Sequence, residues 1–236
     1  MTGAPPYPYR VTYSYTGARP PSTRITTSRT ELFQIGVAFL VLTLDFSIIL
    51  GVSSFLGIVL GLSILSPVVI GVAAAASLTA FVAHEMAHKI AAQRFGAWAE
   101  FRYAPMMLLL SVVMSFAVGF LFAAPGATVV SGMTDPREWG RTSLAGPLAN
   151  LGFAVAFLAA AVGTVSLGVA VFGPLLLLMF FNAWFGAFNL IPFGPLDGAK
   201  VFRWSKPVWL GALAAAALLT IYAYAATFYN TPLPFR

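Results

Sequence analysis

The sequence predicts an all-α polytopic membrane protein with about five to six transmembrane helices and a small membrane-associated β or re-entrant segment after the second of them. Composition is the first observation behind this prediction. Of the 236 residues, 59% are hydrophobic and 8% are charged, and the mean hydropathy of +0.88 lies far above that of soluble domains. Spacing is the second, because the apolar residues gather into runs near the roughly 20 residues that an α-helix needs to cross a bilayer.

The chain is predicted to divide into an N-terminal arm, residues 1–30, and a transmembrane domain, residues 31–230. In the arm, "RVTYSYTG" alternates in the manner of a strand and several prolines oppose a helix. We therefore expect an extended cytoplasmic segment there. The domain then begins with an apolar helix over about residues 31–50.

The second helix is predicted over about residues 67–95. Ser66 and Pro67 form an N-cap and first-turn pair at its start, and Gly96 follows its last turn. Further spans are expected at about 144–165, 171–191 and 207–229. Together with the first helix, these make five spans.

The region at about 97–143 contains an ambiguous apolar segment, residues 104–126. The segment is long enough to span, but it follows the alternating "AWAEFRY" and stops in "APGATVVSG", which is typical of strand and turn. If it does not cross, 12 of the 13 Lys and Arg residues lie on one side, and only Arg236 lies opposite. If it crosses, the split becomes 8 against 5. The positive-inside rule therefore favours a segment that re-enters and returns, with the N-terminus in the cytoplasm.

The formal net charge of +6 does not indicate a nucleic-acid partner, because the basic residues are scattered between apolar blocks. The lipid bilayer is the expected partner, and the expected location is the cell membrane, with several passes. Because the chain has no cysteine, any metal site must use His, Asp, Glu or backbone oxygen.

The stretch "FVAHEMAHKI" places ionisable residues at the end of an apolar span, where they are costly. His84 and His88 are four residues apart, so a helix projects both imidazoles from one face at a spacing that binds one metal ion. Glu85 follows directly, and in H-E-x-x-H a glutamate at this place acts as general base. From His84 to the end of the helix at Arg94 is about 15 Å, which puts the site inside the bilayer toward the cytoplasmic side.

A second polar group lies in "NAWFGAFNLIPFGPLDG", residues 182–198. Asn182 and Asn189 lie on one helix face, and the prolines and glycine after them break the helix near the membrane. Such irregular backbone is tolerated at that depth only where protein buries it or where it lines a wet cavity. Asp197 emerges from this broken end, so the span that carries it is predicted over about 171–198.

A third metal ligand must be a carboxylate, because catalytic zinc sites usually have three protein ligands and the chain offers no third histidine. Asp45 is the rival to Asp197, since it lies inside the first span and needs a partner there. By the predicted topology, Asp45 is about 21 Å from the cytoplasmic start of its helix, deeper than the two histidines. The sequence therefore favours Asp197 and leaves Asp45 as a supporting or packing residue. The acidic side chains that could supply this third ligand are those of Glu31, Asp45, Glu100, Asp135, Glu138 and Asp197.

Three motifs in this order resemble the signatures of the site-2 protease family of intramembrane zinc metalloproteases, in its short archaeal and bacterial form. They are "HEMAH" on the second span, "AGPLAN" (145–150) opening the third and "FNLIPFGPLDG" (188–198) ending the fourth. Gly146 of the second motif is expected to let the third span approach the second closely. The segment 104–126 departs from the family, because it is longer and more apolar than the usual connection.

The resemblance implies one Zn²⁺ per chain, held by His84, His88 and Asp197, with Glu85 as catalytic base and Asn189 as a substrate or oxyanion contact. It implies an endopeptidase that cleaves transmembrane protein substrates in regulated intramembrane proteolysis. The alternating segments 97–103 and 127–132 offer an edge for strand addition of an unwound substrate.

The alternatives to a protease are an intramembrane zinc or proton transporter and a catalytically inactive homologue. A transporter would be expected to distribute its ligands along a pathway or to show an internal repeat.

Overall fold

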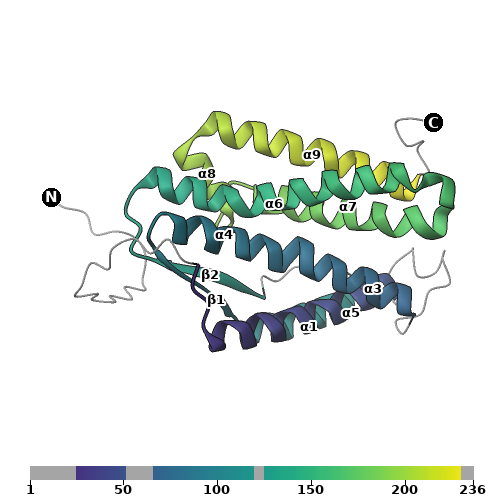
Figure 1. Ribbon diagram of the computed structural model, residues 1–236, viewed down its shortest axis with the longest axis horizontal. Coiled ribbons are helices and arrows are strands. Elements are labelled where there is room, and N and C mark those ends of the chain that lie inside the picture. The colour runs from purple at the N-terminus through teal and green to yellow at the C-terminus, as the bar shows by residue number, and fades with distance from the viewer. Residues whose placement is uncertain (1–24, 52–65, 120–124, 230–236) are drawn as a thin grey trace.

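The computed structural model describes residues 25–51, 66–119 and 125–229. Within these ranges, five helical stretches are long and apolar enough to cross a membrane. They lie side by side in one bundle (Figure 1), and this confirms the predicted polytopic, mainly helical fold. The five are α1 (Arg29–Gly51), the continuous stretch Pro67–Arg94, α6 (Pro136–Gly163), α7 (Val169–Asn189) and α9 (Lys206–Phe228).

The second stretch is built from three helical pieces. These are α3 (Pro67–Ala76), a π-helical turn η1 (Ser77–Val82) and α4 (Ala83–Arg94). As predicted, Ser66 is the N-cap residue and a proline follows it, although the Ser66 side chain makes no capping hydrogen bond. The predicted end is also confirmed, because Gly96 adopts a φ of 81° just after α4, a conformation that glycine reaches without strain.

A hairpin connects the second span to the third. Its strands β1 (Trp98–Tyr103) and β2 (Gly126–Ser131) pair antiparallel, and the apolar helix α5 (Pro105–Val118) lies between them in the chain. Tyr103 pairs with Gly126, so both ends of the connection lie at one end of the sheet. With 14 residues, α5 is shorter than a membrane span. Because β2 pairs with β1, the chain is at the sheet again by Gly126, and that segment 104–126 does not cross the membrane stays a prediction.

Two predicted boundaries were wrong. The third span was expected from residue 144, but α6 begins at Pro136, because the Asp135 carboxylate accepts a hydrogen bond from the Arg137 backbone N–H and caps an earlier start. "AGPLAN" consequently lies inside the helix instead of opening it. The fourth span was expected to reach residue 198, but α7 ends at Asn189. Asp197 opens a separate short helix, α8 (Asp197–Trp204).

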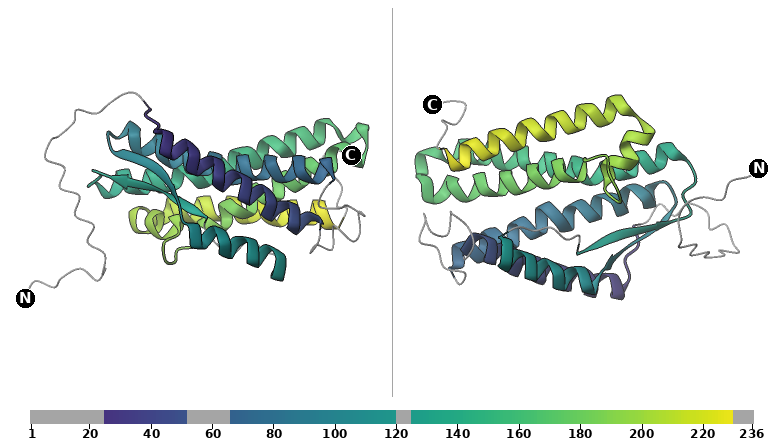
Figure 2. Two further views of the ribbon diagram at one scale, coloured as in Figure 1. Left: turned by 90° about the horizontal axis from the view of Figure 1, so that it is seen from below. Right: turned by 180° about the vertical axis from the view of Figure 1, so that it is seen from behind.

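The bundle has two edges and a centre. α6 packs against both α4 and α7, while α1 packs against α3 and α5 and α9 packs against α7. Figure 2 shows α9 and α1 at opposite edges from a second side.

At the α1 edge, the buried Asp45 accepts hydrogen bonds from the Ser111 and Ser115 hydroxyls of α5, at 2.7 and 2.9 Å. These bonds supply the partner that an acidic residue inside an apolar helix requires.

A buried ion pair fixes the sheet to two helices. The Lys89 Nζ atom of α4 lies 2.5 Å from Glu31 Oε2 of α1, and both side chains are fully buried. The other Glu31 oxygen accepts the Phe101 backbone N–H of β1 at 3.0 Å. α1, α4 and β1 therefore meet at one carboxylate.

The strand predicted in the N-terminal arm falls on residues outside those that the structure describes.

The described structure predicts which loops share a side of the membrane. Arg94 and Arg137 flank the hairpin, whereas Leu167 follows α6 at its far end, and all three are exposed. In this cysteine-free chain, we expect Arg94→Cys and Arg137→Cys to react alike with a membrane-impermeant thiol reagent, and Leu167→Cys to react oppositely. From the distribution of basic residues, the first two should react only after cell lysis. Labelling of Arg137→Cys in intact cells without labelling of Arg94→Cys or Leu167→Cys would show that the hairpin crosses.

Candidate metal centre

Three buried side chains meet between α4, α6 and the start of α8. His84 Nε2 and His88 Nε2 lie 3.0 Å apart, and Asp197 Oδ2 lies 3.2 Å from the first and 2.9 Å from the second. The histidines come from successive turns of α4, as their spacing predicts. The break after α7 carries Asp197 back to them. Among the described residues, these three form the group whose atoms could hold a metal ion.

The partners of the outer ring nitrogens fix how the imidazoles are protonated. His88 Nδ1 lies 2.7 Å from the Thr142 carbonyl oxygen, which only accepts hydrogen bonds. His84 Nδ1 lies 2.5 Å from Asn150 Oδ1, while Asn150 Nδ2 donates to the Ala80 carbonyl at 2.9 Å. Both histidines therefore carry a proton on Nδ1, and Nε2 is the nitrogen that each can present to a metal ion.

The centre is consequently a triangle of three atoms that can bind a metal ion. Two Nε2 atoms and a carboxylate oxygen face one another at 2.9 to 3.2 Å, and a metal cation or a shared proton can hold them at these distances. Tetrahedral zinc with bonds of about 2.0–2.1 Å separates its ligand atoms by about 3.3 Å. The residues thus fit zinc by atom type, charge and spacing.

Gly146 of α6 closes one side of this triangle. A Cβ atom at this position would lie 2.4 Å from His88 Nε2 and 2.7 Å from His84 Cε1. No real side chain fits at such distances, so glycine is required for α6 to approach the imidazoles. The sequence predicted a close approach of the two spans at Gly146, and the structure places that approach at the histidines themselves.

Asn150 is a site residue that the sequence analysis missed. It is fully buried, binds His84, and its amide lies 3.4 Å from Asn182 Oδ1, while Asn182 donates to Thr79 Oγ1 at 2.9 Å. The available signal was an amide side chain at the end of "AGPLAN", in an otherwise apolar span. Asn189, by contrast, donates to the Phe185 carbonyl at the end of α7, and none of its described hydrogen bonds reaches the histidines.

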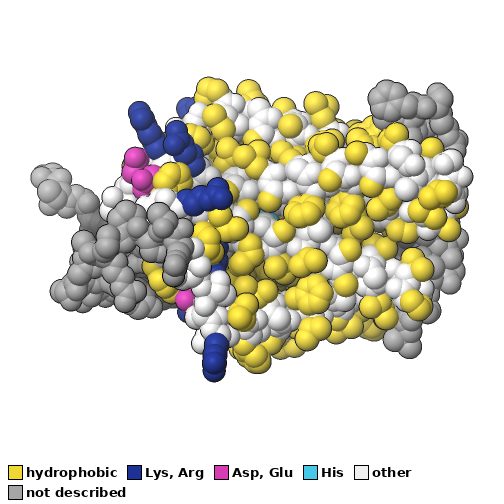
Figure 3. All heavy atoms as spheres, in the orientation of Figure 1, with side chains coloured by type: hydrophobic (Ala, Val, Ile, Leu, Met, Phe, Trp, Pro, Cys, Tyr) yellow, Lys and Arg dark blue, Asp and Glu magenta, His cyan; other side chains and the backbone are white. Residues whose placement is uncertain are grey.

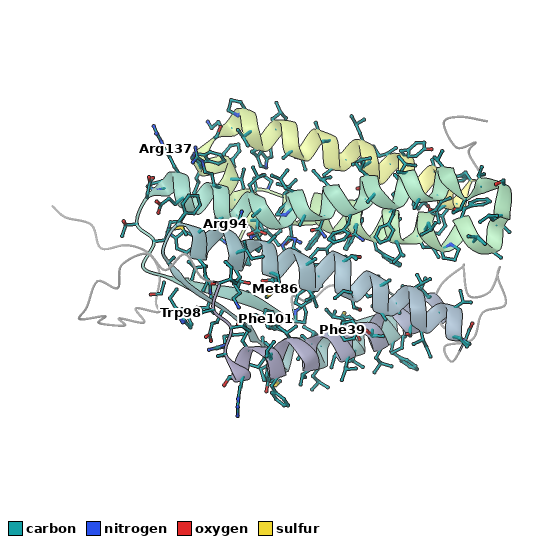
Figure 4. The ribbon with its side chains drawn as sticks, viewed as in Figure 1. Phe39, Met86, Arg94, Trp98, Phe101 and Arg137 are labelled. Atoms are coloured by element: carbon teal, nitrogen blue, oxygen red, sulfur yellow. The ribbon has the colours of Figure 1, made fainter. Side chains whose placement is uncertain are left out.

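The Glu85 carboxylate contacts β2. Its Oε2 atom accepts hydrogen bonds from the Thr128 backbone N–H and from the Thr128 hydroxyl, both at 2.8 Å. The next residue, Met86, lies between α4 and the sheet with Phe101 of β1 (Figure 4), and it packs against the apolar cluster that contains Phe101. Glu85 is thus held beside the histidines by the hairpin.

Four of the other acidic residues are engaged elsewhere. Asp45 binds the two serines of α5, and Glu31 pairs with Lys89. Glu100 pairs with Arg102, and Asp135 caps α6. The structure therefore brings Asp197, and not Asp45, to the histidines.

Comparison with known proteins gives one informative relative. The chain is 33% identical over 134 residues to a protein of Methanocaldococcus jannaschii named "Putative zinc metalloprotease", and the match covers 55% of this chain and 68% of that protein. No protein-family model matches the chain, and no solved structure matches it.

The close approach at Gly146 predicts a defect in metal binding. We expect Gly146→Ala to lower zinc affinity by about 10-fold or more, because the added methyl group displaces both imidazoles. Gly152→Ala is the matched control, since the same helix leaves open space around that position. Zinc content after dialysis against a graded chelator measures the difference. Equal zinc retention by the two variants would contradict the geometry.

The assignment of Asp197 as the carboxylate ligand predicts a difference in zinc binding between two variants. Asp197→Ala should lose bound zinc, because it removes one corner of the triangle. Asp45→Asn should keep its zinc, since its hydrogen bonds run to Ser111 and Ser115. Metal analysis of the two purified proteins tests this contrast, and the opposite pattern would exclude Asp197 as a ligand.

Proposed function

Because the chain belongs to the site-2 protease-like family of zinc metalloproteases, we propose that it is an intramembrane endopeptidase that hydrolyses peptide bonds within or near transmembrane segments of membrane proteins. The observation that carries the proposal is the triangle of acceptor atoms buried in a bundle of membrane-spanning helices. A site of this kind inside an apolar bundle is suited to a substrate that is itself in the bilayer. The physiological process would be regulated intramembrane proteolysis.

His84, His88 and Asp197 would hold one Zn²⁺ per chain, with a fourth position left for chemistry. Zinc bound in this way supplies a Lewis acid that activates water near neutral pH and polarises a carbonyl oxygen. The Asn150 amide and the Thr142 carbonyl keep each imidazole in the tautomer that presents Nε2. These second partners stabilise the ligand geometry without touching the substrate.

Glu85 is the proposed general base. It precedes the second histidine by less than one helical turn, and its carboxylate is mostly buried yet bonded through Oε2 alone among the described contacts. The Oε1 atom is thus the one that would accept the proton of the attacking water and return it to the leaving amine. Asn189 remains the proposed contact to the substrate or to the oxyanion that develops.

The proposed site lies within the membrane toward the cytoplasmic side. His84 is ten residues before the end of α4, a rise of about 15 Å. Lys and Arg side chains gather at the end of the molecule that carries the sheet, while hydrophobic side chains cover the rest of the visible face (Figure 3). By the positive-inside rule, that end and the N-terminus would face the cytoplasm of the cell.

The hairpin offers one edge to an unwound substrate. The outer edge of β1 is occupied, because Glu31 accepts the Phe101 N–H, Gln34 accepts the Tyr103 N–H and Gln93 donates to the Ala99 carbonyl. The outer edge of β2 faces α4, where Thr128 meets Glu85. Because Glu85 accepts the Thr128 N–H, strand addition along β2 would have to use the backbone groups on either side of Thr128.

The transporter alternative is less well supported. Its ligands would be expected along a pathway, whereas the described His and Asp side chains gather at one point and Asp45 is engaged with α5.

Replacement of the proposed base separates metal binding from catalysis. We expect Glu85→Gln to retain zinc and to lose peptide cleavage by a factor of at least about 100, because glutamine cannot accept the proton. Zinc content and cleavage of a model transmembrane peptide by purified protein measure the two effects. A variant that cleaves at the wild-type rate would refute the assignment of a glutamate-assisted protease.

A further inference from the structure

We propose that Thr128 of β2 is the positioning residue for Glu85, and that the hairpin exists partly to hold this carboxylate in its working orientation. The inference rests on the proposed function, since it takes Glu85 to be the general base. It assigns a task to a strand residue outside all three sequence motifs.

Thr128 contacts Glu85 at three places. Its backbone N–H and its hydroxyl both lie 2.8 Å from Glu85 Oε2, and the hydroxyl also lies 3.0 Å from the Glu85 carbonyl oxygen. The hydroxyl has one proton, so it donates to one of these oxygens at a time. The side chain and the backbone of Glu85 are therefore both tied to one residue of β2.

Thr128 can act as a fixed point because β2 is anchored. In the antiparallel register, Thr128 pairs with Phe101 of β1, whose N–H is accepted by Glu31. Glu31 in turn pairs with Lys89, which lies one turn after Glu85 on α4. Contacts thus run from α4 through α1 and the sheet and return to α4 at the proposed base.

This arrangement gives the two oxygens of the Glu85 carboxylate different surroundings. Oε2 accepts two hydrogen bonds, whereas no described contact engages Oε1. A free glutamate side chain samples many rotamers, and two hydrogen bonds to one oxygen select a single orientation. Thr128 therefore leaves Oε1 as the atom that meets the attacking water.

Substitution of Thr128 tests the inference. Thr128→Val keeps the shape, the strand propensity and the backbone N–H, but it removes the hydroxyl. We expect kcat for a model transmembrane peptide to fall about tenfold with KM and zinc content unchanged, and Thr128→Ser to restore most of the loss. Val129→Ala is the matched control, because the neighbouring side chain is 43% exposed and alternates to the other face of the sheet.

Several kinetic outcomes would overturn the inference. They are a Thr128→Val enzyme with wild-type kcat, a serine variant as slow as the valine variant, and a Val129→Ala enzyme that is equally slow. A Thr128→Val enzyme faster than wild type would also overturn it, since the contact would then restrain the base.

A second measurement does not depend on catalysis. The Glu85 carboxylate should protect the Thr128 amide from hydrogen exchange, so we expect Glu85→Ala to speed exchange at Thr128 and to leave the amides of Ala127 and Val129, which face β1, unchanged. Unchanged exchange at Thr128 would overturn the inference. If the wild-type protein cleaved no transmembrane peptide, the proposed function would fail, and the exchange result would still decide whether Thr128 holds Glu85.

Discussion

The contact among His84 Nε2, His88 Nε2 and Asp197 Oδ2 is the constraint that determines how the surrounding structure is arranged. Atoms of this kind stay at these distances only when a metal cation or a shared proton joins them. In an apolar bundle no bulk water takes the place of that cation or proton. The glycine of α6, the two carbonyl oxygens behind the imidazoles and the break after α7 all serve to bring these atoms together and keep them there.

Each polar group added near the centre requires a partner, because unsatisfied groups in hydrocarbon are costly. Asn150 orients His84 and is itself bonded to the Ala80 carbonyl, and the chain of amides continues through Asn182 to Thr79. Lys89 and Glu31 neutralise each other in the next layer toward the sheet. The site therefore consists of polar networks that cross several helices. The hydrogen bonds and the ion pair of these networks fix the helices relative to one another.

The sequence predicted what depends on spacing along one helix and on hydropathy. The four-residue separation of His84 and His88 specifies a shared face, and the apolar runs specify the spans. It could not predict partners that are distant along the chain, such as Thr128 and Glu85, because no periodicity links a strand residue to a helix residue. The start of α6 was missed for a related reason, since hydropathy marks the apolar part of a helix and not the polar turns that precede it.

The π-helical turn at Ser77–Val82 has a consequence for how this protein tolerates change in length. A turn of this kind holds one residue more than an α-helical turn, and one residue corresponds to about 100° of rotation around the helix axis. The residues of α3 pack toward α1 and α7, whereas the histidines beyond the π turn face α6. A deletion of one residue there would restore a regular helix and yet rotate the ligands away from Gly146. The extra residue of the π turn thus lets one continuous helix direct one face toward α1 and α7 before the turn and another face toward α6 after it.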